Sequence, residues 1–151
     1  MSEHHASVAW KRTSADFTYD SYNRAHDMGF KHGDIVLPAS SAPEFRGDAD
    51  RVDPEEDFVA SLSSCHMLTF LAICARRRLS VESYDDEAVG HLEKGAKGKL
   101  WMARVTLSPR IIFTAGTNVD AATLDQLHHL SHEECFIANS VNTEITVLPR
   151  H

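Results

Sequence analysis

The stretch DPEEDFVASLSSCHMLTFLAICARRRL, residues 53–79, constrains the fold more than any other part of the chain. Asp53 is placed to cap a helix, Pro54 suits the first helical position, and Glu56 completes an Asp-x-x-Glu capping box. Apolar residues recur on most sides of the turns that follow, which is typical of a buried helix. The pattern therefore predicts a central helix over residues 54–79, about 39 Å long at 1.5 Å per residue.

The segments on either side of this helix alternate between apolar and polar residues and are separated by turn-forming stretches. We expect strands within residues 7–11, 16–30, 33–38, 80–93, 100–114 and 144–149, a loop over 39–52 and a turn over 94–99. A second helix is predicted over residues 118–136, capped by Asp120 or Asn118. The fold class is therefore α+β, with antiparallel sheets packed on a long central helix and a second helix, in a single domain spanning residues 1–151.

Composition excludes several classes of function. A net charge of −7 argues against general nucleic-acid binding, which needs clustered lysine and arginine. The apolar runs are short, so no membrane span is expected, and the first residues, MSEHHASVAW, do not follow the pattern of a secretory signal. Three cysteines, an odd number, do not suggest a disulfide framework. We expect a protein of the reducing cytoplasm, in which a disulfide would be transient and catalytic.

Two of the cysteines lie on core-facing sides of the predicted helices. Cys65 belongs to the first helix and Cys135 to the second, so packing of the two helices would let the thiols approach. Such a dithiol supports attack by one thiolate and resolution as a disulfide. A free thiol has a pKa of about 8.5, which burial raises and a nearby cation lowers, so the chemistry requires an arginine or lysine. Cys74 is expected to be ordinary core.

Two motifs resemble a known family. The stretch VDPEEDFVASLSSCHMLTFL resembles the signature that starts the central helix of the OsmC/Ohr family, the osmotically inducible and organic hydroperoxide resistance proteins. The stretch HEECFIANSVNTEITV resembles the second cysteine segment of that family, which leads into the final strand. The resemblance implies a thiol-dependent peroxidase that reduces organic hydroperoxides to alcohols without a cofactor or metal, and whose disulfide is reduced by an external dithiol.

The resemblance also implies a role for particular residues. It assigns the peroxidatic cysteine to Cys65, the resolving cysteine to Cys135 and an arginine-binding glutamate to Glu55. Its activating arginine is best matched by Arg24, in SYNRAHDMGF, and Arg46, in EFRGD, is the competing candidate. All of these assignments are expectations that follow from the resemblance.

Helix geometry adds a prediction about assembly. Glu55 and Cys65 are ten positions apart, which corresponds to about 15 Å along a continuous helix. A carboxylate cannot reach a thiol over that distance within one helix. If Glu55 orients an arginine beside Cys65, it must come from another copy of the chain. We therefore expect an intertwined homodimer with shared active sites, as the family resemblance also implies.

Two alternatives remain open at this stage. His128, His132 and Cys135 are spaced i, i+4, i+7 on one helix face, so they and Cys65 could form a closed zinc site. The chain could otherwise be a small-molecule-binding or purely structural dimer with unreactive thiols. A metal bound in stoichiometric amount would favour the first alternative, and slow labelling of Cys65 the second.

Overall fold

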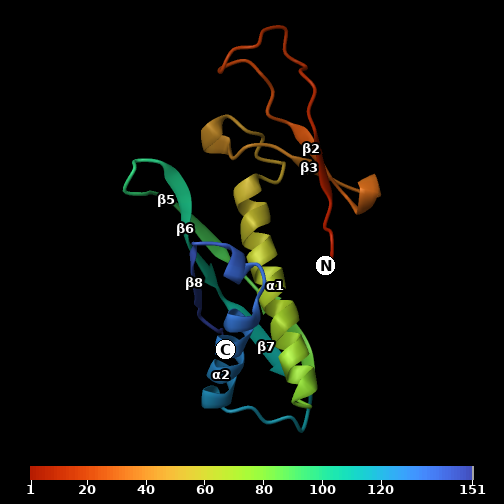
Figure 1. Ribbon diagram of the computed structural model, residues 1–151, viewed down its shortest axis with the longest axis vertical. Coiled ribbons are helices and arrows are strands. Elements are labelled where there is room, and N and C mark those ends of the chain that lie inside the picture. Colours follow the sequence, from red (N-terminus) through yellow and green to blue (C-terminus); the bar gives the residue numbers. More distant parts are fainter. Residues whose placement is uncertain (151) are drawn as a thin grey trace. The chain divides into compact units, whose positions relative to one another are not determined.

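The computed structural model describes residues 1–150, and within them the chain forms two α-helices, eight strands and three short 3-10 helices (Figure 1). The predicted α+β class is confirmed. Two compact units can be recognised, Met1–Asp57 and a second that begins at Phe58, and each is described here by itself. The prediction of a single domain stays a prediction.

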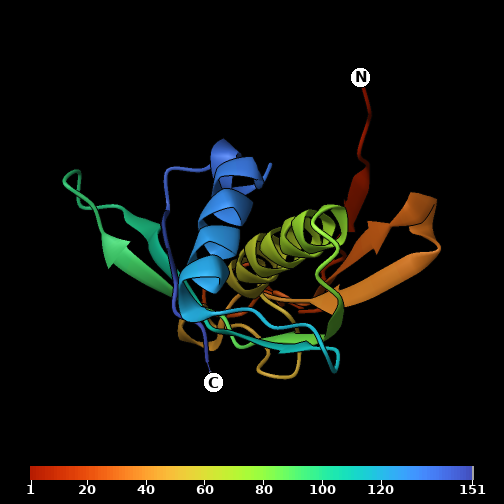
Figure 2. The same cartoon turned by 90° about the horizontal axis from the view of Figure 1, so that it is seen from below.

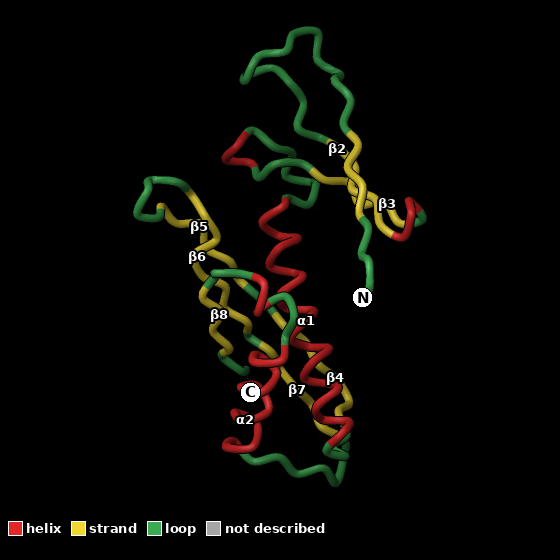
Figure 3. Tube along the Cα trace, viewed as in Figure 1, coloured by secondary structure: helices red, strands yellow, loops and turns green. Residues whose placement is uncertain are grey.

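The first unit contains a three-stranded antiparallel sheet in the order β1-β2-β3. Its strands are β1 (Ala6–Ala9), β2 (His26–Phe30) and β3 (Ile35–Ala39). These agree with the predicted strands at 7–11 and 33–38. Of the one or two strands predicted within 16–30, only β2 at the end of that range is present, because residues 10–25 form a loop (Figure 3).

The loop over residues 10–25 is held together by its own side chains. The Asn23 side chain accepts a hydrogen bond from the Thr13 N–H at 2.8 Å and donates one to the carbonyl of Lys11 at 2.9 Å. The rings of Phe17 and Tyr22 lie 5.3 Å apart between centroids, and both lie near Trp10. The alternating aromatic residues that suggested a strand thus pack on one another within a loop.

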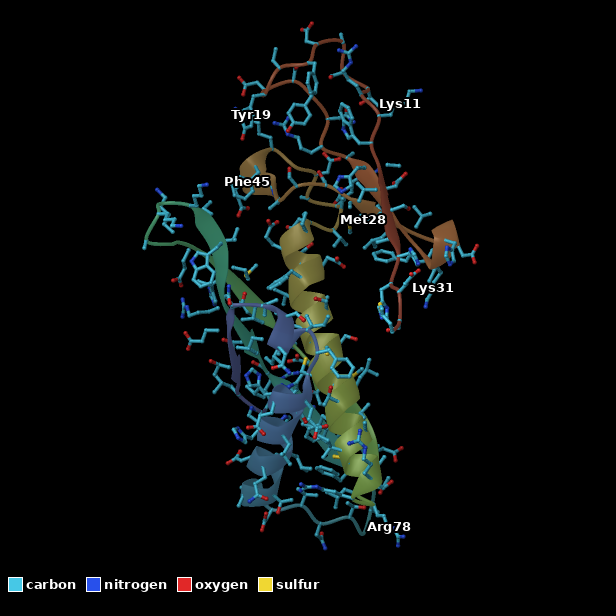
Figure 4. All side chains as sticks on the ribbon, in the orientation of Figure 1. Lys11, Tyr19, Met28, Lys31, Phe45 and Arg78 are labelled. Atoms are coloured by element: carbon cyan, nitrogen blue, oxygen red, sulfur yellow. The ribbon has the colours of Figure 1, made fainter. Side chains whose placement is uncertain are left out.

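Helix α1 (Pro54–Arg76) begins at the predicted capping box. The Glu56 N–H donates to Asp53 Oδ1 at 2.8 Å, and the Asp53 N–H donates to Glu56 Oε2 at 3.1 Å. The helix ends three residues before the predicted end at residue 79. Arg78, labelled in Figure 4, adopts φ 59°, and the Leu79 N–H bonds back to the carbonyl of Cys74, which is a Schellman-type ending.

Two sheets belong to the second unit. One is the antiparallel pair β4-β7, and the other has the order β5-β6-β8. Their strands are β4 (Val81–Asp86), β5 (Val89–Lys94), β6 (Leu100–Leu107), β7 (Pro109–Phe113) and β8 (Glu144–Val147). The predicted strand at 80–93 is therefore two strands in different sheets. The purely antiparallel prediction is also wrong at β8, which pairs parallel with β6.

The break between β4 and β5 has a visible cause. The carboxylate of Asp86, the last residue of β4, accepts hydrogen bonds from the Ser108 N–H at 2.6 Å and from the hydroxyl of Ser63 in α1. Asp86 thereby ties the junction between β6 and β7 to the helix. Both the segment from β4 to β5 and the segment from β6 to β7 pass from one sheet to the other at this point.

Helix α2 (Ala121–Glu134) is capped by Asp120, whose carboxylate accepts the Thr123 N–H at 2.7 Å. Of the two predicted caps, Asp120 is therefore the one that is used. Figures 1 and 2 show α1 and α2 side by side.

The core of the second unit consists of two clusters around α1. The first joins Phe70, Ile73 and Cys74 of α1 to Leu127 of α2, against the β4-β7 sheet. The second joins Leu62 of α1 to side chains of β6 and β8. Cys74 is thus part of the core, as predicted.

One helix, α1, is long and apolar enough to cross a membrane by length and composition. The short apolar runs of the sequence had predicted no such segment. The core helix of a globular domain passes the same test. Because both core clusters are built on α1, we interpret it as a core helix.

Candidate functional site: a pair of thiols between two helices

The two predicted thiols occupy different positions on their helices. Cys65 lies in the middle of α1 and is partly exposed. Cys135 directly follows α2, is only 1% exposed, and its sulfur accepts a hydrogen bond from the Ala138 N–H at 3.5 Å. Neither is in a disulfide. The structure therefore offers one accessible sulfur and one enclosed sulfur.

The side chains of Cys65 and Cys135 lie close enough for the Cys65 thiol to influence the pKa of Cys135. Burial, followed by this contact, raises the pKa of the Cys135 thiol to about 11. The structure thus brings the two thiols together, and Cys135 is protonated at neutral pH.

A pair of histidines lies next to the thiols in the chain. His66 follows Cys65, and its Nε2 lies 3.1 Å from Nδ1 of His128 on α2. The two rings are stacked, with an interplanar angle of 12°, and their residues are 1% and 4% exposed. Sequence reasoning missed this pair, because helical spacing gives no information about contacts between residues 62 positions apart.

Both imidazoles of the pair are neutral at neutral pH. Burial, followed by the proximity of His128 and then of His132, lowers the pKa of His66 from 6.5 to about 4, against an opposing effect of Asp86. Burial likewise lowers the pKa of His128 to about 4. A neutral pair forms one N–H to N hydrogen bond, with one ring as donor and the other as acceptor.

Arg24, the predicted activating arginine, lies in the first unit and is held by its own loop. Its Nη1 donates to the carbonyl of Tyr22 at 2.5 Å and its Nη2 donates to the carbonyl of Tyr19. The guanidinium carbon lies 3.7 Å from the centroid of the Tyr22 ring and 5.0 Å from that of Tyr19, which Figure 4 labels. Such stacking is a favourable cation–π contact.

The competing arginine, Arg46, is exposed and forms an ion pair with Asp20 at 2.7 Å. Glu55 lies in the first turn of α1 and is partly exposed. Within residues 1–150 its carboxylate forms no ion pair. A contact of either arginine with Glu55 and Cys65 across two copies of the chain stays a prediction.

The zinc alternative placed His128, His132, Cys135 and Cys65 around one ion. No group of three or more histidine, cysteine, aspartate or glutamate side chains in the described part of the chain is arranged to hold a metal. His128 is hydrogen-bonded to His66, and Cys135 lies near Cys65.

These observations define a class of protein with an α+β fold and a two-cysteine centre between its helices. The family model described as OsmC-like protein matches residues 47–148, and this chain belongs to the OsmC-like protein family. The resemblance seen in the two cysteine motifs is thereby confirmed. A comparison with curated proteins gave no match.

Solved structures show the same fold. An OsmC-like protein of unknown function from Vibrio cholerae is 47% identical over 99% of this chain and 100% of its own, with a TM-score of 0.92. An organic hydroperoxide resistance protein from Elizabethkingia anophelis is 15% identical over 100% and 97%, with a TM-score of 0.78. One from Bacillus subtilis is 17% identical over 97% and 98%, with a TM-score of 0.69. The last two show likeness of fold alone.

The histidine pair predicts how stability depends on pH. Because the folded pKa values near 4 lie below the ordinary 6.5, the unfolded chain binds more protons between these two values. The contribution of the pair is therefore intact above pH 6.5 and is lost as the pH falls towards 4. One pKa unit corresponds to about 1.4 kcal/mol, so a shift from 6.5 to about 4 corresponds to a loss on the order of 3 kcal/mol for each imidazole.

Urea denaturation at a series of pH values measures this loss. The double variant His66→Leu/His128→Leu should show a flatter dependence than the wild type between pH 6.5 and 4. Equal slopes for the two proteins would show that the pair does not titrate in this range.

Proposed function

We propose that this protein is a thiol-dependent peroxidase that reduces organic hydroperoxides to alcohols. The observation that carries the proposal is the contact between a partly exposed Cys65 and a buried Cys135 in a member of the OsmC-like family. Organic hydroperoxide resistance proteins are among the solved structures with this fold, which supports the choice of substrate class.

The proposed cycle has three steps. The Cys65 thiolate attacks the terminal oxygen of the hydroperoxide, the O–O bond breaks, and the alkoxide takes up a proton and leaves as an alcohol. Cys65 is then a sulfenic acid. The Cys135 sulfur attacks the Cys65 sulfur, the S–O bond breaks, and water leaves as the disulfide forms. An external dithiol reduces the disulfide by thiol exchange and restores both thiols.

The different surroundings of the two sulfurs support these roles. A hydroperoxide in solution can reach the partly exposed Cys65, whereas Cys135 is enclosed. The raised pKa of Cys135 keeps it protonated while Cys65 reacts. The proximity of Cys135 to Cys65 supports attack of its sulfur on the sulfenic acid in the second step.

Ionisation of Cys65 near neutral pH requires a cation beside it. We propose Arg24 for this part, oriented by Glu55 of a second copy of the chain, with Arg46 as the competitor. A guanidinium has five N–H donors. Two N–H groups of Arg24 donate to the carbonyls of Tyr19 and Tyr22. The remaining N–H groups are available for a carboxylate and a thiolate.

We further propose that the protein is an intertwined homodimer. In the first unit the buried apolar side chains are those of Ala39 and Ala42, which form too small a core for a stable independent domain. Val8 and Val36 of its sheet are more than half exposed, and Leu68 on α1 is 61% exposed. A second copy of the chain covering these side chains would remove apolar surface from water.

The dimer is tested by sedimentation velocity. We expect a species of twice the 16.8 kDa mass of the chain, and we expect Leu68→Asp to weaken it, because a charge would be placed in an apolar interface. Gln126→Asp, an exposed change on α2, serves as the control and should leave the dimer intact. A wild type that sediments as a monomer at micromolar concentration would contradict the proposal.

Cysteine variants test the roles of the two thiols. Cys65→Ser should lower the consumption of tert-butyl hydroperoxide by a factor on the order of 10³ or more, because it removes the nucleophile. Cys135→Ser should release one equivalent of alcohol and then stop turning over, because the Cys65 sulfenic acid is no longer resolved. The reductant in this assay is a dithiol too bulky to reach Cys65. Cys74→Ser, a change in the core, is the matched control. Undiminished turnover by Cys65→Ser would contradict the assignment.

Arginine variants identify the activating cation. Removing it should lower the rate of Cys65 alkylation at pH 7 by about tenfold or more, because an adjacent opposite charge typically shifts a pKa by 1–3 units. We expect this for Arg24→Ala, with the rate recovered at high pH, and little change for Arg46→Ala. The reverse result would transfer the role to Arg46, and an unchanged rate in both would exclude both.

A further inference from the structure

The buried histidine pair joins the two helices that carry the thiols. Cys65 directly precedes His66 on α1. Cys135 directly follows the last residue of α2, seven residues after His128. The His66–His128 hydrogen bond of 3.1 Å is thus placed between the same two helices as the sulfur–sulfur contact.

Stability alone does not explain two histidines at this position. Nε2 of His128 and Nδ1 of His132 are buried, and within the described residues they have no hydrogen-bond partner. Each unpaired buried nitrogen costs free energy, because it has lost its bonds to water. Apolar side chains of similar volume would fill the same space without this cost. The pair therefore supplies something other than packing energy.

The histidine pair supplies a directional contact between α1 and α2. Other buried side chains between α1 and α2 include Phe70, Cys74 and Leu127, and Phe70 also stacks on the His128 ring at 4.7 Å. Apolar packing is less directional than a hydrogen bond. An ion pair from Arg76 to Glu134 at 3.7 Å also joins the helices, but both side chains are exposed, and such pairs contribute little. The imidazole pair is buried, directional and stacked.

Disulfide formation is sensitive to this kind of alignment. The two Cβ atoms must come within about 3.5–4.5 Å of each other, with a restricted dihedral angle about the S–S bond. A shift of one helix by about a residue, 1.5 Å, is enough to leave that range. An element that holds α1 in register with α2 therefore controls whether the two sulfurs can join.

We propose that His66 and His128 are positioning residues, whose hydrogen bond holds α1 against α2 so that Cys65 and Cys135 can close a disulfide. This inference rests on the two-cysteine chemistry of the proposed function. It does not depend on which peroxide is the substrate, so it can be tested without one.

The test is the equilibrium of the purified protein with glutathione. Glutathione disulfide oxidises the pair: the two thiols of Cys65 and Cys135 become one disulfide, and two molecules of glutathione are released. The equilibrium constant of this exchange gives the effective concentration of the Cys65 thiol at the Cys135 thiol. The fraction of linked protein is measured by mass spectrometry, with fragmentation between Cys65 and Cys74 to show which sulfur is linked.

We expect His66→Leu and His128→Leu each to lower this effective concentration about tenfold, equivalent to about 30 mV for a two-electron couple. His66→Gln, whose amide N–H can still donate to Nδ1 of His128, should recover much of the wild-type value. Ile73→Ala, a loss of core packing on the same helix, should lower the melting temperature while changing the effective concentration less than twofold.

The possible results separate this inference from the proposed function. If the wild type forms the Cys65–Cys135 disulfide and both leucine variants form it equally well, the positioning role is overturned and the two-cysteine chemistry stands. A drop of the same size in Ile73→Ala would also overturn it, because general loosening would then explain the effect. If the wild type forms no such disulfide, both the inference and the proposed function fail.

Discussion

The structure is organised around the place where the sulfur of Cys65 meets the thiol of Cys135. Three features of the fold converge there. The capping box starts α1 so that Cys65 lies in the middle of the helix, the cap at Asp120 sets the start of α2, and the turn after α2 encloses Cys135 through the N–H of Ala138. The contact joins residues that are 70 positions apart, one partly exposed and one buried, and burial raises the pKa of the Cys135 thiol.

Much of this arrangement could be predicted from local signals. The start of α1, the cap at Asp120 and the burial of Cys74 all depend on residues a few positions apart, and the structure confirms them. The approach of the two thiols was expected from their helix faces. The family motifs gave the same pairing, so two independent lines of reasoning agreed.

The features that sequence reasoning missed depend on contacts between distant residues. The loop over residues 10–25 resembles a strand because its aromatic residues alternate, yet they pack on one another. The parallel pairing of β8 with β6 and the split between β4 and β5 are decided by which strand is adjacent in space. The bond between His66 and His128 likewise exists only once α1 and α2 are packed, and the histidine spacing on α2 pointed to zinc.

The most direct test of the central claim is to add one equivalent of tert-butyl hydroperoxide to the reduced protein and map its cysteines by mass spectrometry. Our account predicts one equivalent of tert-butanol and a single disulfide between Cys65 and Cys135, with Cys74 still a free thiol. Peroxide that remains unconsumed, or an oxidised product in which Cys65 and Cys135 are not joined, would contradict it.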